Sequence, residues 1–281
     1  MPRHGLSDTG WERIQPLLPE EKPPRRGRPW VSHRLIIDAT LWILRTGAPW
    51  RDLPTEFGPW ETVYSRFRRW SRDGTWERLL GWLQADLQDQ GELDMELWCV
   101  DGTITRAARC AGGAPKKNNP ENEPEDHALG RSQGGFTTKI HVKSDGAGHV
   151  IGFTLTGGQC HEATQFELLM EAGPQTNGEE VAGATVPEGW PEKVAGDKAY
   201  SSKAIRDWCR QHGIEPVIPT KSNEKKQEDF DKETYRNRNI VERTIGWLKE
   251  CRRVLSRFEK YAIHYAGMIT LAVIQRLLTT S

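Results

Sequence analysis

A stretch near the C-terminal end, residues 235–249, carries polar residues whose spacing suits chemistry. The residues concerned are Tyr235, Arg238, Glu242 and Lys249. Separations of three, four and seven residues place side chains on one side of an α-helix. Apolar residues such as Val241 lie on the opposite side, so the helix can bury one face and expose the charged one. A carboxylate that binds a metal ion beside a phosphate, with Arg and Lys reaching the phosphate oxygens, would use such a row.

Two further acids each follow an apolar run. Asp101 follows Leu97-Trp-Cys-Val100, and Asp197 ends Lys193-Val-Ala-Gly-Asp197. Continuous apolar runs of this kind are typical of buried strands, so we expect both aspartates at strand ends. With Glu242, they would give three carboxylates able to bridge two divalent ions roughly 3.5–4 Å apart. For any one of these acids alone, a solvated surface charge is the more ordinary interpretation.

The same residues belong to a longer set of motifs. Tyr-x2-Arg-x3-Glu-x6-Lys is matched at every position of residues 235–249. The other motifs are Trp50-Arg-Asp-Leu-Pro54, Val100-Asp-Gly-Thr103, Gly130-Arg-Ser-Gln-Gly-Gly135, Thr138-Lys-Ile-His141, Gly157-Gly-Gln159, Gly196-Asp-Lys-Ala-Tyr200 and Arg236-Asn-Arg-Asn-Ile-Val-Glu242. Together, and in this order, they make the chain resemble the DDE transposases of bacterial insertion sequences, in the insertion-sequence-five group. The chain departs from that pattern at Glu162, where an Asp commonly follows His, and at Gln133, where an Arg is common.

The resemblance implies a mixed α/β fold, with an RNase H-like catalytic domain over residues 91–281. It implies that Asp101, Asp197 and Glu242 are both the catalytic residues and the metal ligands. The cofactor would be Mg²⁺, or Mn²⁺, as two ions. The partners would be double-stranded DNA, as terminal inverted repeats and target, and further copies of the chain in a homodimer or higher oligomer assembled on DNA. The implied location is the bacterial cytoplasm.

Residues 1–90 show the pattern of a small helical domain. We expect helices over 7–19, 32–47, 60–70 and 75–87, because each has an apolar periodicity and the first two begin at a Ser. Eight of the twelve tryptophans precede residue 83 and would anchor its core. Several short helices with tight turns suit a helix-turn-helix-like DNA-binding domain. The third helix carries Arg66, Arg68 and Arg69, and the basic loop Arg25–Arg28 would contact the DNA backbone.

After residue 90 the predicted order is strand, hairpin, helix, strand, helix, strand, helix. The hairpin joins 136–143 to 149–156 around Asp145-Gly-Ala-Gly148, and helices are expected over 161–170 and 201–212. A short strand is expected at 215–219, and a long polar loop over 102–135. Such an order mixes parallel and antiparallel neighbours in one sheet flanked by helices.

Charge is distributed unevenly along the chain. The 39 Lys and Arg residues balance 39 Asp and Glu residues. Residues 198–281 carry 17 basic and 10 acidic residues, net +7, whereas residues 91–197 carry 8 and 17, net −9. An acidic centre followed by a basic end suits metal-binding carboxylates flanked by phosphate-binding groups. Five scattered cysteines without a Cys-x-x-Cys pair indicate a reducing compartment. The apolar stretch 261–278 is interrupted by polar residues, so it predicts a core helix rather than a membrane-spanning helix.

Several other residues have two interpretations. Lys249, Arg252 and Arg253 would continue the Glu242 helix toward DNA, whereas Arg66, Arg68 and Arg69 could equally form a solvated helix face. Trp50 could stack on a base. His141 and His161 have no Cys or second His at zinc-ligand spacing, and adjacency of Cys160 to His161 does not make a catalytic pair.

Two functions besides transposition fit parts of this pattern. The first is a sequence-specific DNA-binding regulator whose nuclease half is inactive, and the intact set of three acids argues against it. The second is an RNase H-like nuclease without strand transfer. Joining of a pre-cut end with a free 3′-hydroxyl to a second duplex distinguishes the second from a transposase.

Overall fold

The computed structural model describes residues 5–21, 31–114, 119–132, 134–173, 189–224 and 230–280. The chain forms two compact units. We call the first the helical unit, comprising residues 1–80, 108–124 and 248–281, and the second the sheet unit, comprising residues 81–107 and 125–247. Packing thus groups the C-terminal helix with the N-terminal helices, whereas the sequence predicted a single boundary near residue 90. The predicted loop Arg25–Arg28 and Gln133 lie outside the described residues.

The helices of the helical unit begin and end at local signals in the sequence. Their bounds are α1 (Asp8–Ile14), η1 (Gln15–Leu17), α2 (His33–Thr46), η2 (Trp50–Asp52), η3 (Thr55–Phe57), α3 (Trp60–Arg72), η4 (Arg109–Gly112), α9 (Arg252–Leu255) and α10 (Ala262–Thr280), with a short strand β7 (Ser256–Arg257) and helix α4 (Thr75–Asp89), which crosses the boundary at residue 80. Ser32 caps α2 by accepting from the Leu35 N–H, and Gly47 ends it at φ 71°. The four helices predicted before residue 90 are confirmed.

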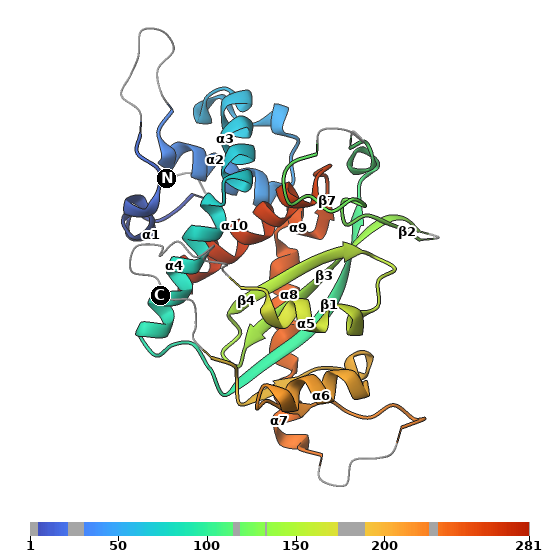
Figure 1. The fold of residues 1–281 in the computed structure, drawn as a ribbon. Helices are drawn as coiled ribbons and strands as arrows, with labels where there is room; N and C mark the ends of the chain where they lie inside the picture. The colour runs from blue at the N-terminus through green and yellow to red at the C-terminus, as the bar shows by residue number, and fades with distance from the viewer. Residues whose placement is uncertain are drawn as a thin grey trace. The chain divides into compact units, whose positions relative to one another are not determined.

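Helix α10 forms the centre of the helical unit, where α2, α3 and α9 pack against it (Figure 1). By length and composition alone Ala262–Thr279 could cross a membrane, but 78% of that window is buried in the structure. Glu123 caps the helix, because its two carboxylate oxygens accept from the Ala262 and Ile263 N–H groups at 2.7 and 3.0 Å. The prediction of a core helix is therefore confirmed.

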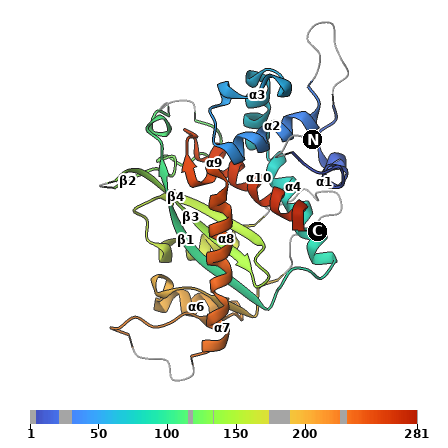
Figure 2. The same cartoon turned by 180° about the vertical axis from the view of Figure 1, so that it is seen from behind.

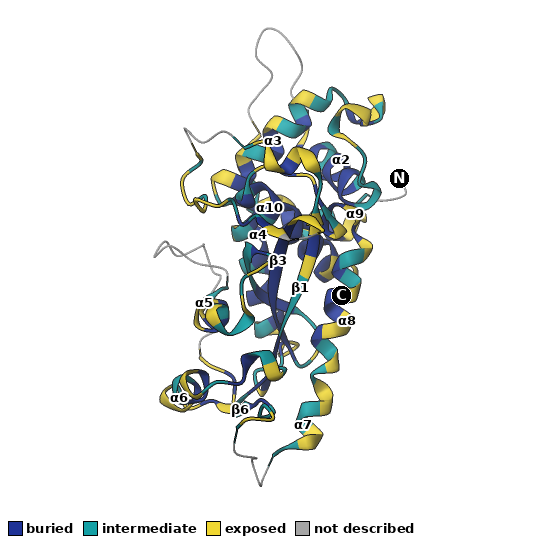
Figure 3. Ribbon diagram, turned by 90° about the vertical axis from the view of Figure 1, so that its right-hand side faces the viewer, coloured by how far each residue is buried: buried dark blue, intermediate teal, exposed yellow. Residues whose placement is uncertain are grey.

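The sheet unit contains strands of both directions. They are β1 (Leu97–Ala107), β2 (Gly130–Ser132), β3 (Gly135–Asp145), β4 (Val150–Gly157), β5 (Lys193–Ala195) and β6 (Glu215–Val217). β3 pairs antiparallel with β1, β2 and β4, whereas β5 runs parallel to β1 and to β6. β3 is buried along almost its whole length (Figure 3). An antiparallel meander followed by two parallel strands is the RNase H-like arrangement, so the predicted mixed α/β fold is confirmed.

Helices cover both faces of this sheet. The elements are η5 (Glu162–Gln165), α5 (Phe166–Glu171), η6 (Lys198–Tyr200), α6 (Lys203–Gln211), α7 (Lys232–Asn237) and α8 (Asn239–Glu250). α5 packs on β3 and β4, and Figure 2 shows α8 crossing the opposite face. Hydrogen bonds anchor this second layer, since Thr244 on α8 donates to the Gly148 carbonyl at 3.1 Å.

Three sequence predictions about these elements were wrong. β1 continues to Ala107, so Asp101 lies within the strand rather than at its end. The helix expected over 235–249 is two helices, α7 and α8, separated at Arg238. α8 stops at Glu250, because Cys251 has an extended backbone with ψ 107°, so Arg252 and Arg253 do not continue the Glu242 helix. The extension of β1 depends on pairing with β3, which is distant in sequence.

Candidate active site

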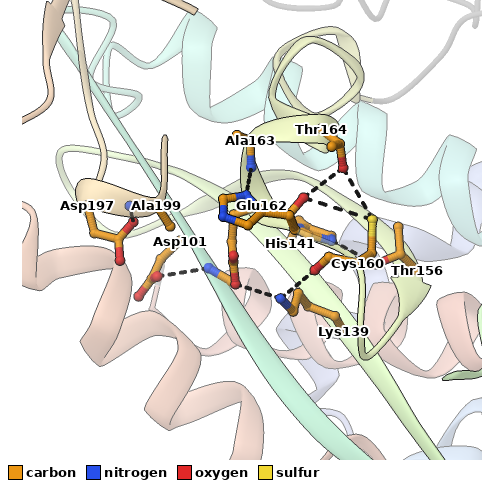
Figure 4. Close-up of polar contacts among 12 residues, drawn as sticks. Asp101, Lys139, His141, Thr156, Cys160, Glu162, Ala163, Thr164, Asp197 and Ala199 are labelled. Atoms are coloured by element: carbon orange, nitrogen blue, oxygen red, sulfur yellow. Dashed lines mark hydrogen bonds and ion pairs between the residues drawn. The ribbon is translucent and has the colours of Figure 1, made fainter. Parts of the chain in front are cut away.

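Asp101 and Asp197 are brought to one level of the sheet by strand register. Cys99 on β1 pairs in parallel with Ala195 on β5, and each aspartate lies two residues further along its strand direction. Because side chains alternate with a period of two, both aspartates emerge on the face of their paired residues. Figure 4 places the two side chains together, and the charge of Asp197 acts on Asp101.

Backbone N–H groups orient both carboxylates. Asp101 Oδ1 accepts from the Gly102 N–H at 2.8 Å, and Asp197 Oδ1 accepts from the Ala199 N–H at 2.8 Å, which caps η6. Burial raises the pKa of Asp101, and the charges of Asp197 and Glu242 raise it further, against the lowering effects of Gly102 and Arg238. Three acids that repel one another in a partly buried site favour a bound cation.

Arg238 is the cation that these acids contact in the structure. Its Nη1 lies 3.7 Å from Asp101 Oδ2, and its Nη2 donates to Glu242 Oε1. Arg238 is placed for this by the turn between α7 and α8, four residues before Glu242. The guanidinium therefore links Asp101 on the sheet to Glu242 on the helix.

The donor chemistry at this site suits a hard divalent ion. Asp101, Asp197 and Glu242 offer carboxylate oxygens only, which are the ligands Mg²⁺ and Mn²⁺ prefer. Glu242 is about half exposed and the Asp101 side chain is 21% exposed, so both are accessible from solvent. Within the part of the chain that the structure describes, no three His, Cys, Asp or Glu side chains are grouped closely enough to hold one ion. Arg238 bonds to two of the three acids in this arrangement.

Comparison with known proteins identifies the family. Residues 92–276 match a family model described as "Transposase DDE domain". The chain belongs to the DDE transposase family. Residues 6–80 match a second model, for transposases of the IS4/5 family. The two matches together cover most of this transposase, and the resemblance found from its motifs is confirmed.

The relatives with similar sequences align with only part of this transposase. "Uncharacterized protein y4sN" of Sinorhizobium fredii is 39% identical over 110 residues, covering 39% of this chain and 82% of the relative. "Insertion element IS402 uncharacterized 16.2 kDa protein" of Burkholderia cepacia is 39% identical over 107 residues, covering 36% of this chain and 73% of the relative. Among solved structures, "Crystal structure of the Mos1 mariner paired end complex with Mn" covers 96% of this chain and 85% of that chain at 11% identity and a TM-score of 0.28.

A second polar cluster in the transposase lies next to the acids, and sequence reasoning missed its role. Lys139 Nζ donates to Glu162 Oε1 at 2.7 Å and to the Cys160 carbonyl at 2.6 Å (Figure 4). Next to them, His141 Nε2 lies 2.9 Å from Thr156 Oγ1, and burial lowers the His141 pKa to about 4. The sequence signals were the motif Thr138-Lys-Ile-His141 and the departure at Glu162, and only the fold shows that Lys139 and Glu162 are partners.

Cys160 and His161 each make a polar contact within their own segment. Cys160 Sγ contacts Thr164 Oγ1 at 3.3 Å, and His161 Nδ1 accepts from the Ala163 N–H at 3.2 Å. His161 therefore caps η5 instead of activating the thiol. His141 is buried and hydrogen-bonded through Nε2 to Thr156 Oγ1, and its Nδ1 has no hydrogen-bond partner among the described residues.

The residues predicted to contact DNA near the C-terminus differ in exposure. Tyr235 is partly exposed and its ring lies under the Arg238 guanidinium. Lys249 on α8 is partly exposed, and Arg252 is exposed. Arg253 is 3% exposed, donates to the Ala48 carbonyl at 2.9 Å and lies 3.4 Å from Glu259. The structure therefore contradicts a DNA contact for Arg253, whose side chain ties parts of the helical unit together.

The arginines of α3 also separate into two groups. Arg66 is 6% exposed, its Nη1 lies 2.8 Å from His33 Nδ1, and it stacks over the Trp70 ring. Arg69, one turn further along the helix, is exposed, and Arg68 is partly exposed against Tyr64. Burial therefore argues against a DNA contact for Arg66. Trp50 packs its ring against Tyr64 and Phe67, so its predicted stacking on a base is not supported.

Proposed function

We propose that this transposase binds the terminal inverted repeats of its element, cleaves to expose 3′-hydroxyl ends and joins these ends to target DNA. Support for the proposal comes from three acids on separate elements: Asp101 on β1, Asp197 just after β5 and Glu242 on α8. Arg238 links two of them, and the charge of the third acts on Asp101.

The three carboxylates are proposed to hold two divalent ions, Mg²⁺ or Mn²⁺. Bound there, the ions would activate the attacking oxygen and stabilise the leaving oxygen of a phosphodiester. The protein's own contribution is orientation: the Gly102 and Ala199 N–H groups fix the rotation of the two aspartates. Arg238, once released from the acids, is close enough to the site to contact a phosphate.

The proposed DNA contacts lie on exposed cations. Along α8, Lys249 lies two helical turns beyond Glu242, and seven residues keep both on one side of the helix. Tyr235 and Arg252 are further candidates. On α3, Arg69 and Arg68 are the candidates for contact with the terminal repeat. A homodimer or higher oligomer would assemble on DNA, in the cytoplasm of a bacterial host.

Strand transfer separates this proposal from a nuclease. The full chain is incubated with Mg²⁺, a pre-cut duplex from the end of its own element carrying a free 3′-hydroxyl, and a labelled target duplex. A transposase gives a joined product that is absent when the 3′ end carries a dideoxynucleotide. Cleavage without any joined product would instead favour a nuclease, and binding without either would favour a DNA-binding regulator.

A further inference from the structure

Gly102 connects the catalytic strand to the polar cluster behind it. Gly102 follows Asp101 in β1, so a side chain at this position would point to the opposite face of the sheet from Asp101. Its partner on β3 is His141. A Cβ atom at Gly102 would lie 3.0 Å from Glu162 Cγ and 3.2 Å from Glu162 Oε1. The Glu162 side chain therefore packs directly on the backbone behind Asp101.

Glu162 is held in that place by Lys139. The ion pair measures 2.7 Å, and the Lys139 side chain is 8% exposed against 22% for Glu162. A buried ammonium is costly without an opposite charge, so neither group can move without leaving the other unpaired. Lys139 also donates to the Cys160 carbonyl, which fixes the start of the segment that carries Glu162.

The same segment contacts the turn that presents Asp197. η5, which begins at Glu162, packs against η6, whose Ala199 N–H is capped by Asp197. Phe166, which follows η5, lies edge-on to the fully buried Tyr200 ring at 6.0 Å. The segment 162–166 therefore contacts both elements next to the aspartates, at the Gly102 backbone on β1 and at the Tyr200 ring on η6.

We propose that the Lys139–Glu162 pair is a positioning device that sets the spacing of Asp101 and Asp197 for the ions they hold. Both members act through backbone packing, and neither contacts the reacting atoms. Groups that orient metal-binding side chains typically contribute 10- to 100-fold to metal affinity. The inference rests on the proposed function, because it assumes that Asp101 and Asp197 are metal ligands.

Mn²⁺ binding to the full chain tests the pair without any DNA or turnover. Free Mn²⁺ is measured by electron paramagnetic resonance in a titration, at a temperature where circular dichroism shows each variant folded. Glu162→Gln and Lys139→Met should each weaken Mn²⁺ binding by about 10- to 100-fold. Lys143→Met is the matched control, since Lys143 is a second buried lysine on β3 that donates to the Met170 carbonyl and not to Glu162.

A second variant perturbs the same contact without changing any charge. Gly102→Ala adds a methyl group against Glu162 Cγ and should weaken Mn²⁺ binding several-fold, even if the lysine and glutamate variants fail to fold. Asp101→Ala is the reference. If Asp101→Ala binds Mn²⁺ as the unchanged protein does, the proposed function itself fails. If Asp101→Ala loses binding while Glu162→Gln or Gly102→Ala keeps it, or if Lys143→Met weakens it equally, the positioning inference is overturned.

Discussion

Arg238 and Asp101 form an ion pair, with 3.7 Å between Nη1 and Oδ2. The same guanidinium bonds to Glu242, so one cation satisfies two of the three acids. A part-buried group of carboxylates needs positive charge nearby, and in this structure the arginine supplies it. Arg238 would therefore compete with the proposed metal ions for the same oxygens, although its motif had suggested a phosphate contact.

Removal of this competition should be measurable. Arg238→Gln keeps a side chain of similar reach but leaves Asp101 and Glu242 without their cation. Mn²⁺ affinity should then rise, by about tenfold if the lost pairing amounts to about 1.4 kcal/mol. The measurement is calorimetric titration of Mn²⁺ into the DNA-free protein. A weaker affinity would show that Arg238 organises the acids for the ion instead of competing with it.

Two arginines of α3 that differ in burial predict different outcomes. Exchange of the exposed one, Arg69→Gln, should weaken DNA binding and reduce the log-log salt dependence by about 1, because one phosphate contact is lost. Arg66→Gln should instead lower the free energy of unfolding by roughly 1–3 kcal/mol, because it breaks the contacts with His33 and Trp70. Each variant serves as the control for the other. If both variants lose DNA affinity equally and both keep the stability of the unchanged protein, the separate roles of Arg66 and Arg69 are contradicted.

Lys249 and Arg253 form a similar contrast near the end of the chain. Lys249→Ala should weaken DNA binding and lower the salt slope by about 1. Arg253→Ala should destabilise the helical unit, since it leaves the buried Glu259 without its partner. Binding is measured at several salt concentrations with a duplex of the terminal repeat. If Lys249→Ala leaves the salt dependence of DNA binding unchanged, Lys249 does not contact a phosphate.

His141 predicts a pH dependence of stability. Burial, followed by the charge of Lys139, lowers its pKa to about 4 against the opposing charge of Glu162, whereas the unfolded value is about 6.5. Between pH 6.5 and 4 the unfolded chain binds a proton that the folded chain does not, so stability falls as pH falls. This group contributes up to about 1.4 kcal/mol per pH unit. The free energy of unfolding, measured with urea at pH 7 and at pH 5.5, should therefore change less between the two pH values in His141→Gln than in the unchanged protein. An identical change in both proteins would contradict the lowered pKa of His141.

Local signals in the sequence predicted much of the fold. The Ser32 cap and Gly47 stop gave the bounds of α2, and the turn at Asp145-Gly-Ala-Gly148 gave the β3–β4 hairpin. These features depend on residues close together in the chain. The extension of β1 past Asp101 could not be predicted in the same way, because pairing with β3 rather than local composition stabilises Gly102–Ala107.

The candidate site was predicted unevenly for the same reason. Asp101, Asp197 and Glu242 stand in the motifs that carry the family resemblance, and the resemblance made them candidates. The ion pair of Arg238 with Asp101 joins residues 137 positions apart, and the Lys139–Glu162 pair forms only when β3 and η5 meet. Burial of Arg66 and Arg253 likewise depends on tertiary packing, which a count of basic residues does not contain.

Cleavage by variants of the three acids tests the central claim most directly. Asp101→Ala, Asp197→Ala and Glu242→Ala are each compared with the unchanged protein on DNA carrying the element's end, with Mg²⁺ for cleavage and without it for binding. Each variant should bind the end with an affinity close to that of the unchanged protein, because metal ligation and phosphate contact are separate functions, and each should lose cleavage. Cleavage at a tenth of the normal rate or more by any one variant would remove that residue from the catalytic set.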